Sequence, residues 1–244
     1  MGVSVSCPRC GGAVRPPDLM HTEWRCDSDG AVLPLHVPRH INAPIVEAAR
    51  ARVVAGAAEP LPMWSPWPML PGWTITGVGW VGDDRSGVRA TVVACSGPCP
   101  VEHGPADILI IAEEPGVGLG PRFAGIPGPD PGPFLERVPA VTEHGWLGGT
   151  DGRRRPGATA GDADMAGQAK VRADGWPTPL WLVKSPEDRC AYAGEARGLW
   201  LYLISWPAVA GYVLAEDLLL HDLVESLPSQ LLYGAPAPNL HSPV

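Results

Sequence analysis

The apolar positions of this 244-residue chain gather into many short runs rather than into long helical stripes. Short runs rich in Val, Ile, Leu, Thr and Trp, bounded by Gly, Pro, Asp and Ser, are typical of β-strands. They predict strands at Trp73–Val81, Arg89–Ser96, Asp107–Ala112, Ala169–Val171, Pro179–Val183, Arg189–Ala193 and Leu199–Ser205. The turn sequence Asp83–Gly87 predicts that the first two strands form a hairpin.

Few segments have a helical pattern. Ala43–Ala58 is rich in Ala, Val and Arg and is followed by Glu59-Pro60, which predicts a helix that ends there. Gly198–Ala215 is uncharged and long enough to be considered as a membrane span. Pro207 interrupts its middle, so we expect a buried strand followed by a helix that begins at the proline. Leu218–Val224 is predicted to continue from that helix as an amphipathic element.

These elements predict an α+β fold, with a small N-terminal zinc ribbon followed by a mostly antiparallel sheet and a few helices. The expected division is a ribbon over residues 1–36, a helical spacer over 37–60, a body over 61–235 and a loose tail over 236–244. Within the body, residues 142–166 are rich in Gly, Arg and Asp with few apolar partners, and are predicted to be a mobile insertion.

The ribbon is predicted from three cysteines near the N-terminus. Cys7 and Cys10 form a Cys-x2-Cys turn followed by glycine, and Cys26-x2-Asp29 repeats that spacing, again with glycine after it. Two such turns bring four donors close enough for a tetrahedral Zn²⁺ site. Glycine after the second ligand allows a positive φ, which turns backbone N–H groups toward the sulfur.

The fourth ligand of the predicted site is an unusual one. Its spacing points to Asp29, whose carboxylate would give the loaded site a formal charge of −2. His21 and His36 are the alternatives, since each lies on a segment that can fold back toward the cysteines.

Composition narrows the classes of partner. The net charge of −8 argues against a large nucleic-acid surface, because phosphate contacts need clustered Lys and Arg. Six cysteines without a secretory signal are expected in a reducing cytoplasm, as ligands or buried thiols. We expect no association with a membrane.

A glycine-rich segment after a strong strand is the candidate ligand site of the body. Gly116, Gly118 and Gly120 are spaced so that their N–H groups can cradle an anion, and Arg122 can add a countercharge. The carboxylates of Asp83, Asp84 and Asp130 are candidates for chemistry near such a ligand, although the sequence shows no nucleophile–base arrangement. A purely structural glycine loop is the alternative, since the segment matches neither a dinucleotide nor a P-loop motif.

Two further clusters favour packing over chemistry. Cys95, Cys99 and His103 match no common metal spacing, and Cys95 at a strand end is expected to be a small buried side chain. The Trp-rich stretch Met63–Trp73 is expected to pack on the sheet, with a ligand cage as the alternative.

Several motifs together resemble one family, that of uncharacterised actinobacterial proteins headed by a zinc ribbon. They are Met63–Trp73, Gly82–Gly87, Ala94–Pro98, Ala112–Gly120, Gly128–Pro133, Pro177–Trp181 and Gly194–Ala196. The resemblance covers nearly the whole chain outside residues 142–166. It implies histidine at the fourth ribbon position, so Asp29 is a departure, and Cys99 and His103 are additions. It implies no established activity.

Two functions therefore follow from the sequence. The first is a cytoplasmic binding or regulatory module that contacts a protein partner through the ribbon or a Trp-rich surface. The second is a binder of, or an enzyme for, a small anionic metabolite at Gly116–Arg122. The sequence predicts Zn²⁺ as cofactor and identifies no catalytic residue, because it shows no nucleophile–base arrangement.

Overall fold

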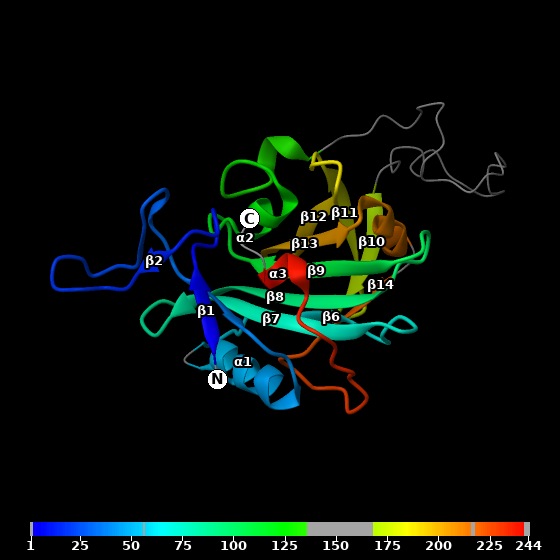
Figure 1. Ribbon diagram of the computed structural model, residues 1–244, viewed down its shortest axis with the longest axis horizontal. Coiled ribbons are helices and arrows are strands. Elements are labelled where there is room, and N and C mark those ends of the chain that lie inside the picture. Colours follow the sequence, from blue (N-terminus) through cyan, green and yellow to red (C-terminus); the bar gives the residue numbers. More distant parts are fainter. Residues whose placement is uncertain (1, 56, 136–167, 216–217, 242–244) are drawn as a thin grey trace.

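The computed structural model describes residues 2–55, 57–135, 168–215 and 218–241. Its main element is a sheet of eleven strands, in the order β1-β5-β7-β8-β9-β13-β12-β11-β10-β14-β6. Neighbouring strands are antiparallel except β10 and β14, which run parallel. Figure 1 shows this sheet crossing the molecule, with α1 and α2 on opposite sides of it. The predicted sheet-rich α+β fold is confirmed.

The seven predicted strands are present with bounds that differ from the predicted ones by one to a few residues, and four further strands join them in the main sheet. The strands of the main sheet are β1 Val3–Ser6, β5 Leu35–Pro38, β6 Trp64–Pro66, β7 Thr74–Asp83, β8 Gly87–Pro98, β9 Pro105–Glu113, β10 Gln168–Ala173, β11 Trp176–Val183, β12 Cys190–Ala196, β13 Leu199–Trp206 and β14 Leu218–Asp222. A separate small sheet contains β2 Val14–Arg15, β3 Arg25–Cys26 and β4 Gly30–Ala31. The helical elements are α1 Ala43–Val54, α2 Leu119–Ala124, η1 Gly132–Phe134, η3 Ala208–Ala215 and α3 Pro238–His241.

The central strands are apolar on both faces because the sheet separates two cores. In β9, Ile108 and Ile110 belong to one core and Leu109 and Ile111 to the other. Successive side chains of a strand point to opposite faces, so a continuous apolar run is what a sheet buried on both sides requires. The first core lies under α1, and the second under α2 and α3.

Helix α1 follows its predicted start and ends early, at Val54 rather than Ala58. The side chain of Asn42 accepts a hydrogen bond from the Ile45 N–H at 3.0 Å and so caps the first turn. Ile45, Val46, Ala49 and Val53 face the sheet and are buried.

The segment after Pro207 differs from the prediction. It forms the 3-10 helix η3, and Leu218–Asp222 then forms strand β14 instead of prolonging a helix. The burial of β14 alternates residue by residue, so the amphipathic pattern has the period of a strand. No helix within the described ranges is long and apolar enough to span a membrane.

Two predicted boundaries need correction. The ribbon boundary at residue 36 falls inside β5, and β1 and β5 pair with each other and, through β5, with β7 of the main sheet. The tail from residue 236 is packed as far as His241 rather than loose, since Ala237 and Leu240 are buried. The predicted insertion at 142–166 lies outside the described residues.

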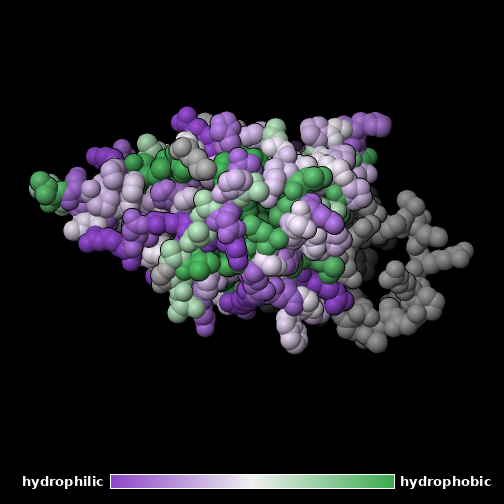
Figure 2. Space-filling model, turned by 90° about the horizontal axis from the view of Figure 1, so that it is seen from below, coloured by the Kyte–Doolittle hydropathy of each residue, from purple (hydrophilic) through white to green (hydrophobic). Residues whose placement is uncertain are grey.

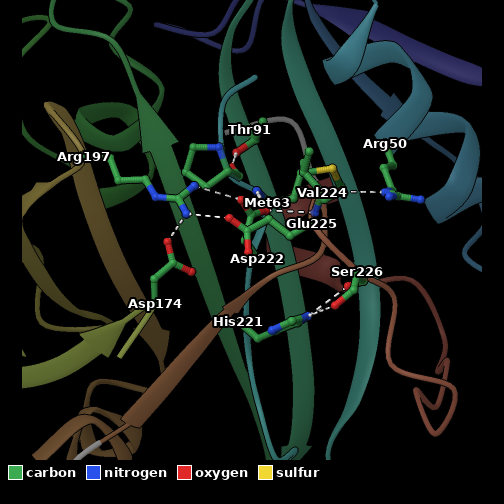
Figure 3. Close-up of polar contacts among 11 residues, drawn as sticks. Arg50, Met63, Thr91, Asp174, Arg197, His221, Asp222, Val224, Glu225 and Ser226 are labelled. Atoms are coloured by element: carbon green, nitrogen blue, oxygen red, sulfur yellow. Dashed lines mark hydrogen bonds and ion pairs between the residues drawn. The ribbon is translucent and has the colours of Figure 1, made fainter. Parts of the chain in front are cut away.

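One buried carboxylate links β14 to the residue before β6 and to the turn between β12 and β13. Asp222 at the end of β14 accepts hydrogen bonds from the N–H groups of Met63 and Val224, at 2.9 and 2.8 Å. Its other oxygen accepts one from Arg197 at 3.1 Å. Figure 3 shows Arg197 reaching from the β12–β13 turn toward both Asp222 and Asp174. These contacts explain how the short strands β14 and β6 stay attached.

Candidate metal centre

Cys7, Cys10, Cys26 and Asp29 meet at one point outside the main sheet. One donor atom from each lies within 4.8 Å of the others. Cys7 Sγ is 3.2 Å from Asp29 Oδ2, and Cys10 Sγ is 3.4 Å from Cys26 Sγ. We call residues 7–33, which leave the sheet after β1 and return before β5, the cysteine lobe (Figure 1, left).

Local turns account for this convergence. Gly11 and Gly30, which follow the second ligand of each turn, have φ of 76° and 71°. These values lie in the left-handed region that favours glycine, as the sequence predicted. The first turn is closed by hydrogen bonds from the Gly11 N–H to Cys7 O and from the Cys7 N–H to Gly12 O. The N–H of Arg9 points to Cys7 Sγ at 3.4 Å.

Both alternative histidines lie outside the cluster. The His21 N–H bonds Asp18 in an exposed turn. His36 stacks on Trp80 with ring centroids 5.3 Å apart, and its Nε2 is 3.0 Å from the carbonyl oxygen of Gly82. In the described part of the chain, the geometry therefore favours Asp29 over either histidine.

The donor set fits a metal ion. Three thiols and a carboxylate are donors that Zn²⁺ accepts in structural sites. Burial raises the pKa of Cys7 to about 12 and also raises the pKa of Cys10, which favours the protonated form of these two thiols when no cation is bound. Hydrogen bonds from Cys10 and the other cysteines lower the pKa of Asp29, which keeps this donor ionised. A bound cation would replace the thiol protons that burial otherwise favours.

A cleft of about 620 Å³ separates the cysteine lobe from the body. The lobe contributes Arg9 and Trp24, and the body contributes Val81, Arg85 and the segment Pro115–Val117. Each side holds the other by an arginine. Arg9 donates to the carbonyl oxygens of Gly116 and Val117, and Arg85 donates to that of Thr22. The shape of the cleft thus depends on the lobe.

The predicted anion cradle is largely occupied by the protein's own carboxylates. The N–H of Gly116 bonds Asp130 at 2.8 Å, and the N–H of Gly120 bonds Glu113 at 3.2 Å. Gly120 has a packing role as well, because a Cβ there would lie 2.3 Å from the ring of Tyr202. Gly118 has φ of 89° at the start of α2. The turn is thus built as a structural connection, and Arg122 faces the cysteine lobe.

The other candidate residues are not gathered into a site. Asp83 caps its own hairpin turn through the N–H groups of Arg85 and Ser86, and Asp84 pairs with Arg52. Cys95 is buried in the core and burial raises its pKa to about 12, which makes it a poor nucleophile.

The remaining candidates are Cys99, His103 and the tryptophans. Cys99 is partly buried and His103 exposed, with no metal cluster around them among the described residues. Trp64 and Trp73 are buried in the core and the partly buried Trp67 packs against it, so the Trp-rich stretch packs on the sheet.

Glu113 is the polar residue whose role the sequence did not reveal. It is fully buried at the end of β9, and its Oε2 accepts hydrogen bonds from the N–H groups of Leu119 and Gly120. Its Oε1 and the hydroxyl of Tyr202 have no hydrogen-bond partner within the described ranges. Burial raises the pKa of Glu113 to about 8. The available signal was a carboxylate directly after the apolar run Ile108–Ala112 of this strand.

Comparison with known proteins identifies one family. Its profile matches residues 1–146 and 141–240, which together cover nearly the whole chain. No curated protein matches the chain, and no solved structure does. The chain belongs to DUF6758, a family of unknown function.

Proposed function

We propose that this protein is a zinc-ribbon binding module in which Cys7, Cys10, Cys26 and Asp29 hold one Zn²⁺. The observation that carries the proposal is the convergence of these four donors within 4.8 Å, from two turns of the same spacing. Thiolates favour Zn²⁺ over the hard cations Mg²⁺ and Ca²⁺, which prefer oxygen ligands. A reducing cytoplasm suits the site, since the thiols must stay unoxidised.

The role of the metal in this proposal is structural. The small sheet of the lobe has strands of two residues each, too short to build a core. Bound Zn²⁺ would supply folding free energy that such a segment lacks. Because the lobe forms one wall of the cleft, a metal-fixed lobe would also fix the cleft.

The tip of the lobe supports contact with a protein partner. Leu19 and Met20 are fully or almost fully exposed, and Figure 2 shows apolar surface at that end of the molecule. Asp18 orders this tip by accepting hydrogen bonds from the N–H groups of Met20 and His21. Two adjacent large apolar side chains on an ordered turn are more typical of a contact surface than of a solvated loop.

A small anionic ligand in the cleft is the second candidate. Arg9 and Arg85 line the cleft and bond backbone carbonyl oxygens, and neither forms an ion pair with a carboxylate of the described residues. Trp24 and Val81 offer apolar surface beside them. The proposed anion site is therefore the cleft rather than the Gly116–Arg122 turn. Thermal-shift measurements with inorganic pyrophosphate test it: the ligand should raise the melting temperature of the wild type more than that of Arg85→Gln.

Metal analysis tests the main proposal. Protein purified without chelators should contain about one zinc per chain. Replacement by Co²⁺ should give the intense near-ultraviolet absorption of thiolate-to-metal charge transfer, and Cys7→Ser and Cys26→Ser should weaken it. Protein without metal, or a Co²⁺ spectrum unchanged in both variants, would show that the proposal is wrong.

A further inference from the structure

Arg122 reaches from the body into the cysteine lobe. It belongs to α2, and its Nη1 donates a hydrogen bond to the carbonyl oxygen of Cys7 at 3.2 Å. Its guanidinium also lies against Gly11, since a Cβ on that glycine would be 2.7 Å from Nη2. Arg122 therefore contacts the turn that carries the first two metal donors.

Among the residues that the structure describes, this buried arginine has no carboxylate partner. Its residue exposure is 8%, and its Nε has no hydrogen-bond partner within the described ranges. No carboxylate of the described residues forms an ion pair with it, whereas Arg89 pairs with Glu114 and Arg189 with Asp188. Buried charges in proteins are normally paired, because an unpaired one loses its hydration without compensation.

The charge of the metal centre supplies the missing partner. Three thiolates and one carboxylate around Zn²⁺ leave a formal charge of −2. The Arg122 Nη1 lies 3.2 Å from the carbonyl oxygen of Cys7, so the guanidinium charge is held directly beside this donor set. The Arg122 guanidinium therefore has no thiolate charge beside it while the thiols are protonated, and gains that charge when thiolates bind the metal.

We propose that Arg122 is the counter-cation of the metal centre and couples metal loading to docking of the cysteine lobe on the body. This inference rests on the proposed zinc site. It assigns Arg122 to an anion within the protein, the metal–thiolate group, and explains why an arginine is buried at this junction.

The surroundings of α2 hold Arg122 in that position. Glu113 Oε2 accepts the Leu119 and Gly120 N–H groups at 2.8 and 3.2 Å, which fixes the start of the helix. Gly120 allows the helix to lie directly on the Tyr202 ring. The Arg122 Cζ lies 4.8 Å from the centre of the Phe123 ring, a further contact that favours the cation.

The test compares zinc affinity in four proteins: wild type, Arg122→Gln, Arg122→Lys and Arg89→Gln. Affinity is measured by competition with a chromophoric chelator under reducing conditions. We expect Arg122→Gln to weaken zinc binding by about 10–100-fold, the range found for outer partners of metal ligands. Arg122→Lys should restore most of the affinity because it keeps the charge. Arg89→Gln, which loses a partly exposed arginine that already has a carboxylate partner in Glu114, should bind as the wild type does.

Stability with and without zinc provides the second measurement. Arg122→Gln should lower the melting temperature of the zinc-loaded protein and leave the metal-free protein unchanged or more stable, since an uncompensated buried cation is removed. A purely structural role predicts equal losses in both forms and unchanged zinc affinity, and that result would overturn the inference. If the wild type itself binds no zinc, the proposed function fails instead. If Arg122→Gln does not fold, Arg122→Lys provides the test. A loss of zinc affinity in Arg122→Lys as large as that in Cys7→Ser would show that the positive charge at position 122 does not support zinc binding.

Discussion

Asp29 stands where the resemblance implied histidine, and its neighbours make a carboxylate suitable there. Its Oδ2 lies 3.2 Å from Cys7 Sγ and 3.5 Å from Cys26 Sγ. Arg9 also contributes a positive charge that favours the ionised carboxylate. Aspartate adds one negative charge relative to histidine, and the positive charge of the nearby Arg9 offsets part of it.

Replacement of Asp29 is the sharpest test of the fourth ligand. Asp29→Ala should weaken zinc binding by about tenfold or more, because one of four direct donors is lost. Asp29→His should retain zinc. Asp27→Ala is the matched control, since Asp27 lies in the same turn but is exposed and pairs with Arg15. Loss of zinc in His21→Ala with retention in Asp29→Ala would show the assignment to be wrong.

Glu113 makes stability depend on pH at the body's core. Its folded-state pKa is raised to about 8 by burial, above the ordinary value of 4.5. Between these values the folded state binds more protons than the unfolded state, so its contribution to stability falls as pH rises. The slope reaches about 1.4 kcal/mol per pH unit.

Chemical denaturation at several pH values measures this effect. Relative to the wild type, Glu113→Gln should remove the decline between about pH 5 and 8, since its amide cannot ionise. Glu114→Gln is the control, because Glu114 is partly exposed and paired with Arg89. Identical pH profiles for wild type and Glu113→Gln would contradict a buried, protonated Glu113.

At the scale of elements, one buried carboxylate reinforces the short strands β14 and β6 at one end of the sheet. Asp222 bonds the N–H groups of Met63 and Val224 as well as Arg197 (Figure 3). Its side chain is 2% exposed, whereas that of Glu225, which pairs with the same arginine, is 59% exposed. Asp222 and Glu225 therefore allow a buried contact with Arg197 to be compared with an exposed contact of the same arginine.

Their alanine variants should differ strongly. Asp222→Ala should destabilise the protein by about 2–6 kcal/mol, because two buried N–H groups lose their acceptor at about 1–3 kcal/mol each, while Arg197 keeps its contacts with Asp174 and Glu225. Glu225→Ala should cost no more than about 1 kcal/mol. Urea denaturation measures both, and similar losses would mean that the network is not centred on Asp222.

At the scale of the molecule, the metal is expected to order the lobe and leave the sheet intact. The main sheet has two cores of its own, whereas the small sheet β2–β3–β4 has none. Removal of zinc by a chelator should increase amide hydrogen exchange within residues 7–33 and leave β8, β9 and β13 protected. A variant with serine at Cys7, Cys10 and Cys26 should not respond to the chelator. Equal changes in both regions would show that lobe and body unfold together.

The sequence by itself determined the features that depend on short-range spacing. The three cysteines, Asp29 and their trailing glycines occupy two short turns, and turn geometry alone brings each pair of donors together. The central strands were also predictable, because a continuous apolar run bounded by turn residues has few other structures open to it. Helix α1 was predictable from its composition, although its end was placed four residues late.

Only the tertiary structure decided the roles of the glycine-rich turn, of Arg122 and of β14, because these roles depend on contacts that the sequence does not show. The glycine-rich turn reads as an anion cradle until Glu113 and Asp130 are seen to occupy its N–H groups. Arg122 reads as a ligand contact until it is found against Cys7, 115 residues away in the chain. Strand β14 is too short for its alternation of apolar and polar residues to be recognised in the sequence, and its strand conformation is set by pairing with β10 and β6. Arg122 and β14 have partners far away in the sequence, and hydrogen bonding with those partners, rather than local propensity, sets their structure. Glu113 and Asp130 lie within 14 residues of the N–H groups that they bond, but only the folded chain directs their carboxylates there.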